Sequence, residues 1–171
     1  YRAGYTGQSS NAVAIGRNAG LDLQGISSVA IGSNAGYSSQ GSSSVAIGLS
    51  AGQNNQGING IAIGRLAGQN NQTRESISIG YSAGRSNQGT SSIAIGYLAG
   101  DTLQGSSSIA IGYRAGYSIQ GNLSVAIGHD AGNNQATGCI AIGGFAAGSA
   151  PGQSENSIAI GNQAGNRNQR S

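Results

Sequence analysis

The chain of 171 residues contains no lysine, methionine or tryptophan, and only one proline, one phenylalanine and one cysteine. Charged residues make up 8% of it, against about 25% in typical soluble domains. No apolar run approaches the roughly 18 residues that a transmembrane helix needs, so the sequence predicts no membrane insertion. A formal charge of +3, scattered along the chain, does not favour nucleic-acid binding.

Side chains for catalysis or metal binding are equally scarce. One histidine and one cysteine cannot assemble a Cys/His zinc site, and no G-x-x-x-x-G-K-S/T phosphate loop occurs. Asp130 follows His129, but neighbours on a strand point to opposite faces, so we expect a surface pair rather than a catalytic dyad. The sequence therefore predicts no enzymatic activity, no cofactor and no metal.

What the chain has in excess is glycine, with 32 residues, and a repeat. The tetrapeptide Val-Ala-Ile-Gly at 13–16 recurs every 16 residues up to 125–128, with Ile for the Val in four copies and Ser78 for the Ala in one. Irregular units fill 125–157, and a last copy begins at Ile158. The repeat is V/I-A-I-G-x-x-A-G-x-x-x-Q-G-x-x-S, with positions one to sixteen counted from the V/I. Incomplete units at both ends, without a capping repeat, lead us to expect a segment of a longer fibre or caps supplied by neighbouring copies.

The alternation of large and small residues in this repeat is typical of a β-strand, and β-branched side chains favour it. Glycine at the fourth, eighth and thirteenth positions permits the positive φ angles of tight corners. The sequence thus predicts an all-β fold, a parallel β-solenoid or β-roll over 1–171, with one 16-residue rung per repeat. At about 4.8 Å per rung, the rod is about 50 Å long.

Stacked rungs place equal positions in columns. The first and third positions are expected to point inward, together with the alanines of the seventh. The glutamines of the twelfth position predict a hydrogen-bonded ladder at a corner, the alternative being a ligand-binding row. Second-position alanines then face outward, and small apolar residues there predict a homotrimer interface. These interface candidates are Ala14, Ala30, Ala46, Ala62, Ala94, Ala110 and Ala126.

The variable fifth position carries a run of rings: Tyr81, Tyr97, Tyr113 and His129. Exposed aromatic rings with polar neighbours predict a stripe that faces a host-surface glycan or a protein receptor. The alternative is that the rings only stabilise the rod by stacking on one another. The irregular stretch 143–152 is expected to bulge outward, as a recognition loop or as a simple register correction.

The recurring Ser-Val-Ala-Ile-Gly, as at 28–32, resembles the repeats in head domains of YadA-like trimeric autotransporter adhesins; phage and giant-virus fibres carry similar repeats. The resemblance covers nearly the whole chain and implies a left-handed, trimeric β-roll displayed outside a cell or virion. The family repeat is typically shorter and lacks the glutamine column, and no neck, stalk or anchor motif is present here.

These observations predict a non-enzymatic extracellular fibre or adhesin segment, a rigid rod for display at a cell or virion surface. A self-assembling structural filament is the nearer alternative. An ice-binding solenoid is a more distant one, because the chain has no column of threonines.

Overall fold

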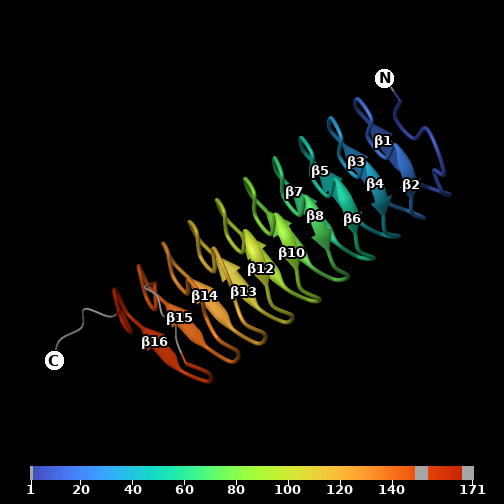
Figure 1. Ribbon diagram of the computed structural model, residues 1–171. Helices are drawn as coiled ribbons and strands as arrows, with labels where there is room; N and C mark the ends of the chain where they lie inside the picture. The colour runs from blue at the N-terminus through green and yellow to red at the C-terminus, as the bar shows by residue number, and fades with distance from the viewer. Residues whose placement is uncertain (1, 149–153, 167–171) are drawn as a thin grey trace.

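The computed structural model describes residues 2–148 and 154–166, and within them the protein is all-β, with no helix. The chain winds into a rod whose successive turns stack on one another, with the two ends of the chain at opposite ends of the rod (Figure 1). All paired strands are parallel, and they form a ten-stranded and a six-stranded sheet on two sides of the rod. The predicted parallel β-solenoid is confirmed.

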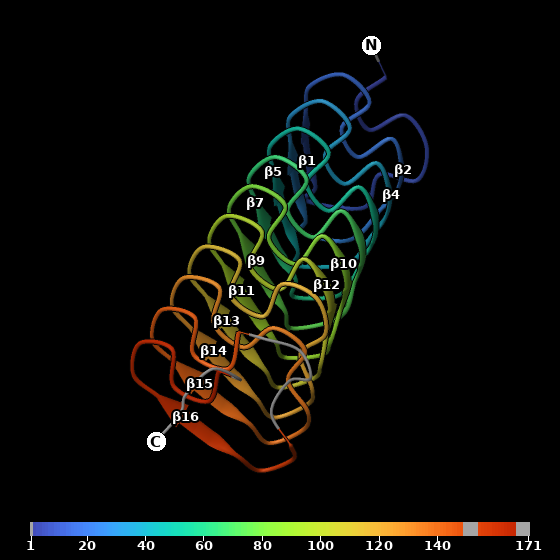
Figure 2. The same cartoon turned by 60° about the vertical axis from the view of Figure 1, so that its left-hand side comes forward.

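The ten-stranded sheet is built from the V/I-A-I segments, one per rung, and it runs the length of the rod (Figure 2). Its strands, in spatial order, are β1 (Val13–Ile15), β3 (Val29–Ile31), β5 (Val45–Ile47), β7 (Ile61–Ile63), β9 (Ile77–Ile79), β11 (Ile93–Ile95), β13 (Ile109–Ile111), β14 (Val125–Ile127), β15 (Ile140–Ile142) and β16 (Ile158–Ile160).

The six-stranded sheet is built from the segments that end in the repeat glutamine. Its strands are β2 (Asp22–Gln24), β4 (Ser38–Gln40), β6 (Asn54–Gln56), β8 (Asn70–Gln72), β10 (Ser86–Gln88) and β12 (Thr102–Gln104). Beyond β12 only isolated parallel bridges continue this side, from Gln104 to Gln120 and from Gln120 to Gln135.

The repeat length sets the register of both sheets. Val13 pairs with Val29 and Gln24 with Gln40, so each regular rung advances by 16 residues. The ten-stranded sheet keeps this alignment through the irregular units, where Val125 pairs with Ile140. One repeat is therefore one rung, as the sequence predicts.

Glycines shape the corners in two different ways. At the fourth position Gly80 has a φ of +127°, and a Cβ added there would lie 2.5 Å from the carbonyl oxygen of Gly96 in the next rung. At the thirteenth position the prediction of a positive φ is wrong. Gly41 is needed because a Cβ would lie 2.5 Å from the Gly57 carbonyl carbon one rung away. Close stacking of backbones, rather than φ, therefore favours glycine at that corner, although Thr73 occupies the same position in one unit.

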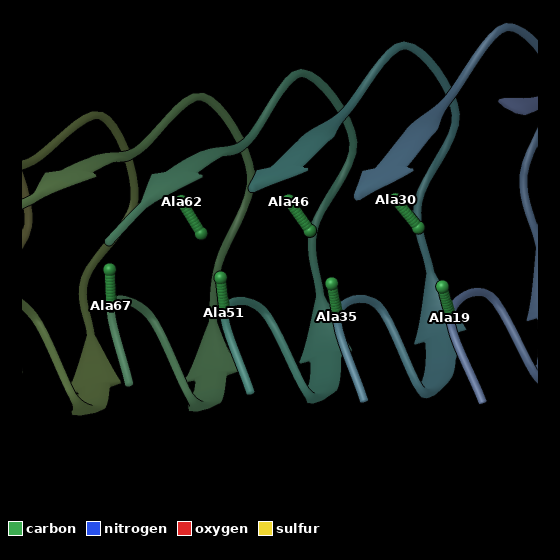
Figure 3. Close-up of a cluster of buried hydrophobic side chains, with 7 residues drawn as sticks. All are labelled: Ala19, Ala30, Ala35, Ala46, Ala51, Ala62 and Ala67. Carbon is green, nitrogen blue, oxygen red and sulfur yellow. The ribbon is translucent and has the colours of Figure 1, made fainter. Parts of the chain in front are cut away.

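The core is made of alanine, which reverses the predicted inside and outside of the first strand. Second-position alanines such as Ala46 face seventh-position alanines such as Ala51 across the interior of the rod (Figure 3). A Cβ added at Gly52 would lie 2.7 Å from the buried Gln56 Oε1 and 3.2 Å from the Cβ of Ala46, so little space is left beside the second-position alanines. The first- and third-position Val and Ile side chains consequently point outward.

The predicted interface at the second-position alanines is therefore wrong. Six of the seven named alanines are completely buried inside a single chain, and the seventh is partly buried and packed against the same core. The six buried residues are Ala30, Ala46, Ala62, Ala94, Ala110 and Ala126; the partly buried one is Ala14. None of the six is accessible to another chain.

Candidate functional site

The repeat glutamines lie in the interior and act on the chain's own backbone. Gln40 Nε2 donates to the carbonyl oxygen of Val29 at 2.8 Å and to Gln56 Oε1 at 3.3 Å. The same link to the next glutamine joins Gln88, Gln104, Gln120 and Gln135. The predicted amide ladder thus exists in segments, inside the rod. The repeat glutamines from Gln24 to Gln135 are each at most 2% exposed, so they cannot form a row that binds a ligand.

The repeat serines close the same corner. Ser44 Oγ donates to the carbonyl oxygen of Gly41, three residues earlier, at 2.6 Å, and the same contact recurs along the rod. In the irregular unit the buried Cys139 takes the place of the serine, and its Sγ lies 2.9 Å from the carbonyl oxygen of Ser154. The lone cysteine is thus a substitute for a structural serine.

The aromatic stripe is present on the surface and is longer than the sequence predicts. Ring centroids of successive members lie 5.1 Å apart from Tyr81 to Tyr97 and from Tyr97 to Tyr113, and 4.7 Å apart from Tyr113 to His129. A fifth ring, that of Phe145, lies 5.0 Å beyond His129. We call these five rings the ring stripe.

Phe145 was hidden from sequence reasoning because it occupies the sixth position of its unit, not the fifth. Gly144 takes the fifth position, and Phe145 has a positive φ of +56°, as other sixth-position residues such as Asp130 also have a positive φ. Its backbone N–H donates to the carbonyl oxygen of His129, which keeps it in the stack. The described part of the predicted bulge at 143–152, residues 143–148, continues the rung, and residues 149–153 lie outside the described residues.

The stripe presents ring edges, because the ring faces cover one another. Interplanar angles of 11° and 7° show that the three tyrosine rings are nearly parallel. The Arg65 guanidinium lies 5.6 Å from the Tyr81 ring centroid at one end of the stack. Tyr81, Tyr97 and Tyr113 remain 38%, 46% and 44% exposed. Within residues 2–148 and 154–166 their hydroxyls have no hydrogen-bond partner, so the stripe offers a row of free hydroxyls.

His129 and Asp130 are paired, as expected, but they lie on the same side of the chain. His129 Nδ1 is 3.0 Å from Asp130 Oδ2, and Arg114 Nε is 3.2 Å from Asp130 Oδ1. The opposite-face rule does not apply because Asp130 is a corner residue with a φ of +52°. Through Asp130, His129 of the ring stripe is thus linked to Arg114 of the neighbouring rung.

A second ion pair is more deeply buried. Arg85 Nη2 lies 3.0 Å from Asp101 Oδ2, and Thr102 Oγ1 donates to the same oxygen at 3.1 Å. Burial raises the pKa of the Asp101 carboxyl, although the Arg85 charge and the hydrogen bonds oppose the shift. Its other oxygen has no hydrogen-bond partner among the described residues.

Apolar side chains cover the outer surface of the ten-stranded sheet. The first- and third-position Val and Ile of its ten strands form two columns, which we call the aliphatic face. In the middle of the rod Ile47 and Ile63 are each 36% exposed, whereas the second-position alanine between the two columns is fully buried in each strand.

The part of the chain that the structure describes encloses no pocket and gathers no three His, Cys, Asp or Glu side chains that could hold a metal ion. It also contains no helix of the length and apolarity that crossing a bilayer requires. The surfaces described above are therefore the candidates for function.

Comparison with known proteins gives no match to a family model, to a curated protein or to a solved structure. The likeness to YadA-like head repeats thus rests on the repeat residues alone.

Proposed function

We propose that this chain is a non-enzymatic segment of an extracellular fibre or adhesin, displayed at a cell or virion surface. The observation that carries the proposal is the unbroken stack of ten parallel strands, each joined to the next in the same register. Such a stack makes a stiff rod about 43 Å long from the first strand to the last, at about 4.8 Å per rung. A stiff rod holds its outward columns at fixed spacing, which suits display.

Chains of this kind associate side by side as a homotrimer. The number three is taken from the resemblance to trimeric adhesin heads. A single chain supports the idea of association, because its buried apolar side chains are alanines and one cysteine. Alanine buries little apolar area, and hydrophobic stabilisation scales with that area.

The ring stripe is the proposed contact with a host-surface glycan or a protein receptor. Sugars commonly stack on ring faces, and here the faces are occupied by neighbouring rings. Contact is therefore made through the ring edges and the three free hydroxyls, which repeat once per rung.

Two triple variants test this contact. Changing Tyr81, Tyr97 and Tyr113 to Phe keeps the stack and removes the hydroxyls, whereas changing them to Ser removes both. We expect both variants to lose binding to host cells and to immobilised glycans, with the melting temperature of the Phe variant within a few degrees of the parent. A control variant with Tyr5 and Tyr37, which lie outside the stripe, changed to Ser should bind normally.

Unchanged binding by the Ser variant would reject the stripe as an attachment surface. If its melting temperature also collapsed, the stripe would serve only to hold the rungs together.

A further inference from the structure

Among the apolar side chains of the single chain, the small ones lie inside and the large aliphatic ones lie outside. The three clusters of buried core residues consist entirely of alanine. Every strand of the ten-stranded sheet instead places two β-branched side chains on the opposite surface. Water-exposed aliphatic area is unfavourable, and in this chain it forms one continuous strip rather than scattered residues.

The size of the aliphatic face fits an interface between chains. Ten strands of three residues, at about 3.3 Å per residue and 4.8 Å per strand, make a strip of roughly 450 Å² before side-chain relief is counted. Two such strips approach the roughly 1,000 Å² of buried surface that a specific interface requires. At the first and third positions of all ten strands the residues are Val or Ile, with no polar or charged side chain among them.

The aliphatic face continues into the rungs in which the repeat length and the six-stranded sheet do not. The six-stranded sheet ends at β12, and the units beginning at Val125 and Ile140 depart from 16 residues. The ten-stranded sheet nevertheless continues in register through β14, β15 and β16, and each of these strands carries the same two aliphatic columns. A surface that only tolerated exposure would not require this continuity.

The periodic structure of the face selects its occupant. A partner must present apolar side chains at the same spacing, once per rung over ten rungs. Another copy of this chain does so by construction, because its own aliphatic face repeats at the same interval. Rotation about an axis parallel to the rod also places each rung beside the same rung of its neighbour, which is the closed arrangement that homo-oligomers favour.

From these observations we infer that the aliphatic face is the surface through which copies of this chain pack against one another, parallel and with equal rungs side by side. The inference rests on the side-by-side association in the proposed function and assigns it a surface. The interface between chains is thus assigned to the first- and third-position side chains, not to the second-position alanines on the other side of the same strands.

Two charge variants test the surface. Ile47→Lys with Ile63→Lys places two charges on the aliphatic face in the middle of the rod, at positions that are open to water in the single chain. Leu23→Lys with Leu103→Lys is the control, because these exposed leucines lie on the six-stranded sheet. In sedimentation velocity we expect an oligomeric parent, an oligomeric control and a monomeric Ile47/Ile63 variant with the parent's circular dichroism spectrum.

Disulfide trapping gives an answer even if that variant fails to fold. One chain carries Ile93→Cys and Ile95→Cys together with Cys139→Ser. The last change removes the native cysteine and places there the serine that most repeats have at that position. Mild oxidation should produce covalent dimers of these chains, because a disulfide needs Cα atoms within about 7 Å. Leu103→Cys, also with Cys139→Ser, should give none. Mixing with chains that carry Val45→Cys, Ile47→Cys and Cys139→Ser should give no links between the two kinds, whose cysteines are three rungs, or about 14 Å, apart.

The outcomes separate the inference from the proposal on which it rests. An oligomeric parent whose state is unchanged by Ile47→Lys and Ile63→Lys, with no cysteine links on this face, overturns the inference and leaves side-by-side association standing. A monomeric parent overturns both. Links between unlike rungs overturn the equal-rung arrangement.

Discussion

Ser78 donates a hydrogen bond to Gln88 Oε1 in the interior of the rod, at a position where the other complete tetrapeptides have alanine. Gln72 Nε2 lies 3.5 Å from the same hydroxyl, so the serine stands between two glutamines that would otherwise be neighbours in the ladder. Where alanine occupies the position, as at Ala94, Gln88 donates directly to Gln104.

We expect Ser78→Ala to change the free energy of unfolding by less than about 1 kcal/mol, because Gln72 can donate to Gln88 once the hydroxyl is gone. The converse change, Ala94→Ser, should interrupt the ladder one rung later at a similarly small cost. Urea unfolding followed by circular dichroism measures both. A loss of several kcal/mol in Ser78→Ala would show that the hydroxyl cannot be replaced by the ladder.

Replacing a ladder glutamine by leucine should be much more damaging. Gln104 Nε2 donates to the carbonyl oxygen of Ile93 at 2.7 Å and to Gln120 Oε1 at 3.2 Å. Gln104→Leu leaves these buried oxygens without that donor, for which we expect a loss of about 1–3 kcal/mol. Gln53→Leu, at a half-buried position where Oε1 accepts one hydrogen bond from Gln69, is the control and should cost less, about 1 kcal/mol at most. Equal midpoints of urea unfolding for the two variants would contradict the structural role of the ladder.

Deletions test the equivalence of one repeat and one rung. Removing residues 93–108 joins Ser92 to Ile109, which restores the repeat, so we expect a shorter rod with a parent-like circular dichroism spectrum. Removing residues 93–100 joins Ser92 to Asp101 and shifts all later columns by half a rung. That variant should melt far below the parent. Similar melting curves for the two deletions would be incompatible with the stacking described here.

The buried Asp101 carboxyl should make stability depend on pH. A carboxyl whose pKa is raised by burial binds its proton more tightly in the folded chain than in the unfolded chain. Between the two pKa values the folded state therefore holds more protons, and its stability falls as the pH rises through that interval. The amide in Asp101→Asn cannot ionise. Between about pH 3.5 and pH 7 the melting temperature of this variant should therefore fall less than that of the parent.

Asp22→Asn, at an exposed position, should follow the parent across the same range. If Asp101→Asn also follows the parent, the buried carboxyl does not contribute to the pH dependence of folding.

The length and register of the repeat were sufficient to predict the rungs, the parallel pairing and the line of rings from Tyr81 to His129. A strict spacing of 16 leaves one way to align the strands. Alternation along the strand does not say which side faces the core, because turning Val13 inward or Ala14 inward satisfies the same pattern. The width of the interior decides, and it is set where the second-position and seventh-position alanines, such as Ala46 and Ala51, face each other across the rod. The occurrence of alanine at both the second and seventh positions was the signal that only small side chains fit between these two columns.

The misassigned members of the site have local causes. Phe145 joins the stripe from the sixth position, a corner residue with positive φ, and Asp130 meets His129 for the same backbone reason. Simple strand alternation describes neither position. Likewise, a motif search for charged pairs does not find Arg85 and Asp101, because they are neighbours only through stacking, 16 residues apart.

The direction of the hydrogen bonds between rungs has a mechanical consequence. Because the strands run across the rod, these bonds lie along its length, and a pull on the two ends strains the outermost rung first. A detached rung of 16 residues can extend to about 54 Å at roughly 3.4 Å per residue, whereas its stacked thickness is about 4.8 Å. Under tension the rod would lengthen about tenfold per rung, one rung at a time, and so dissipate a sudden load instead of breaking.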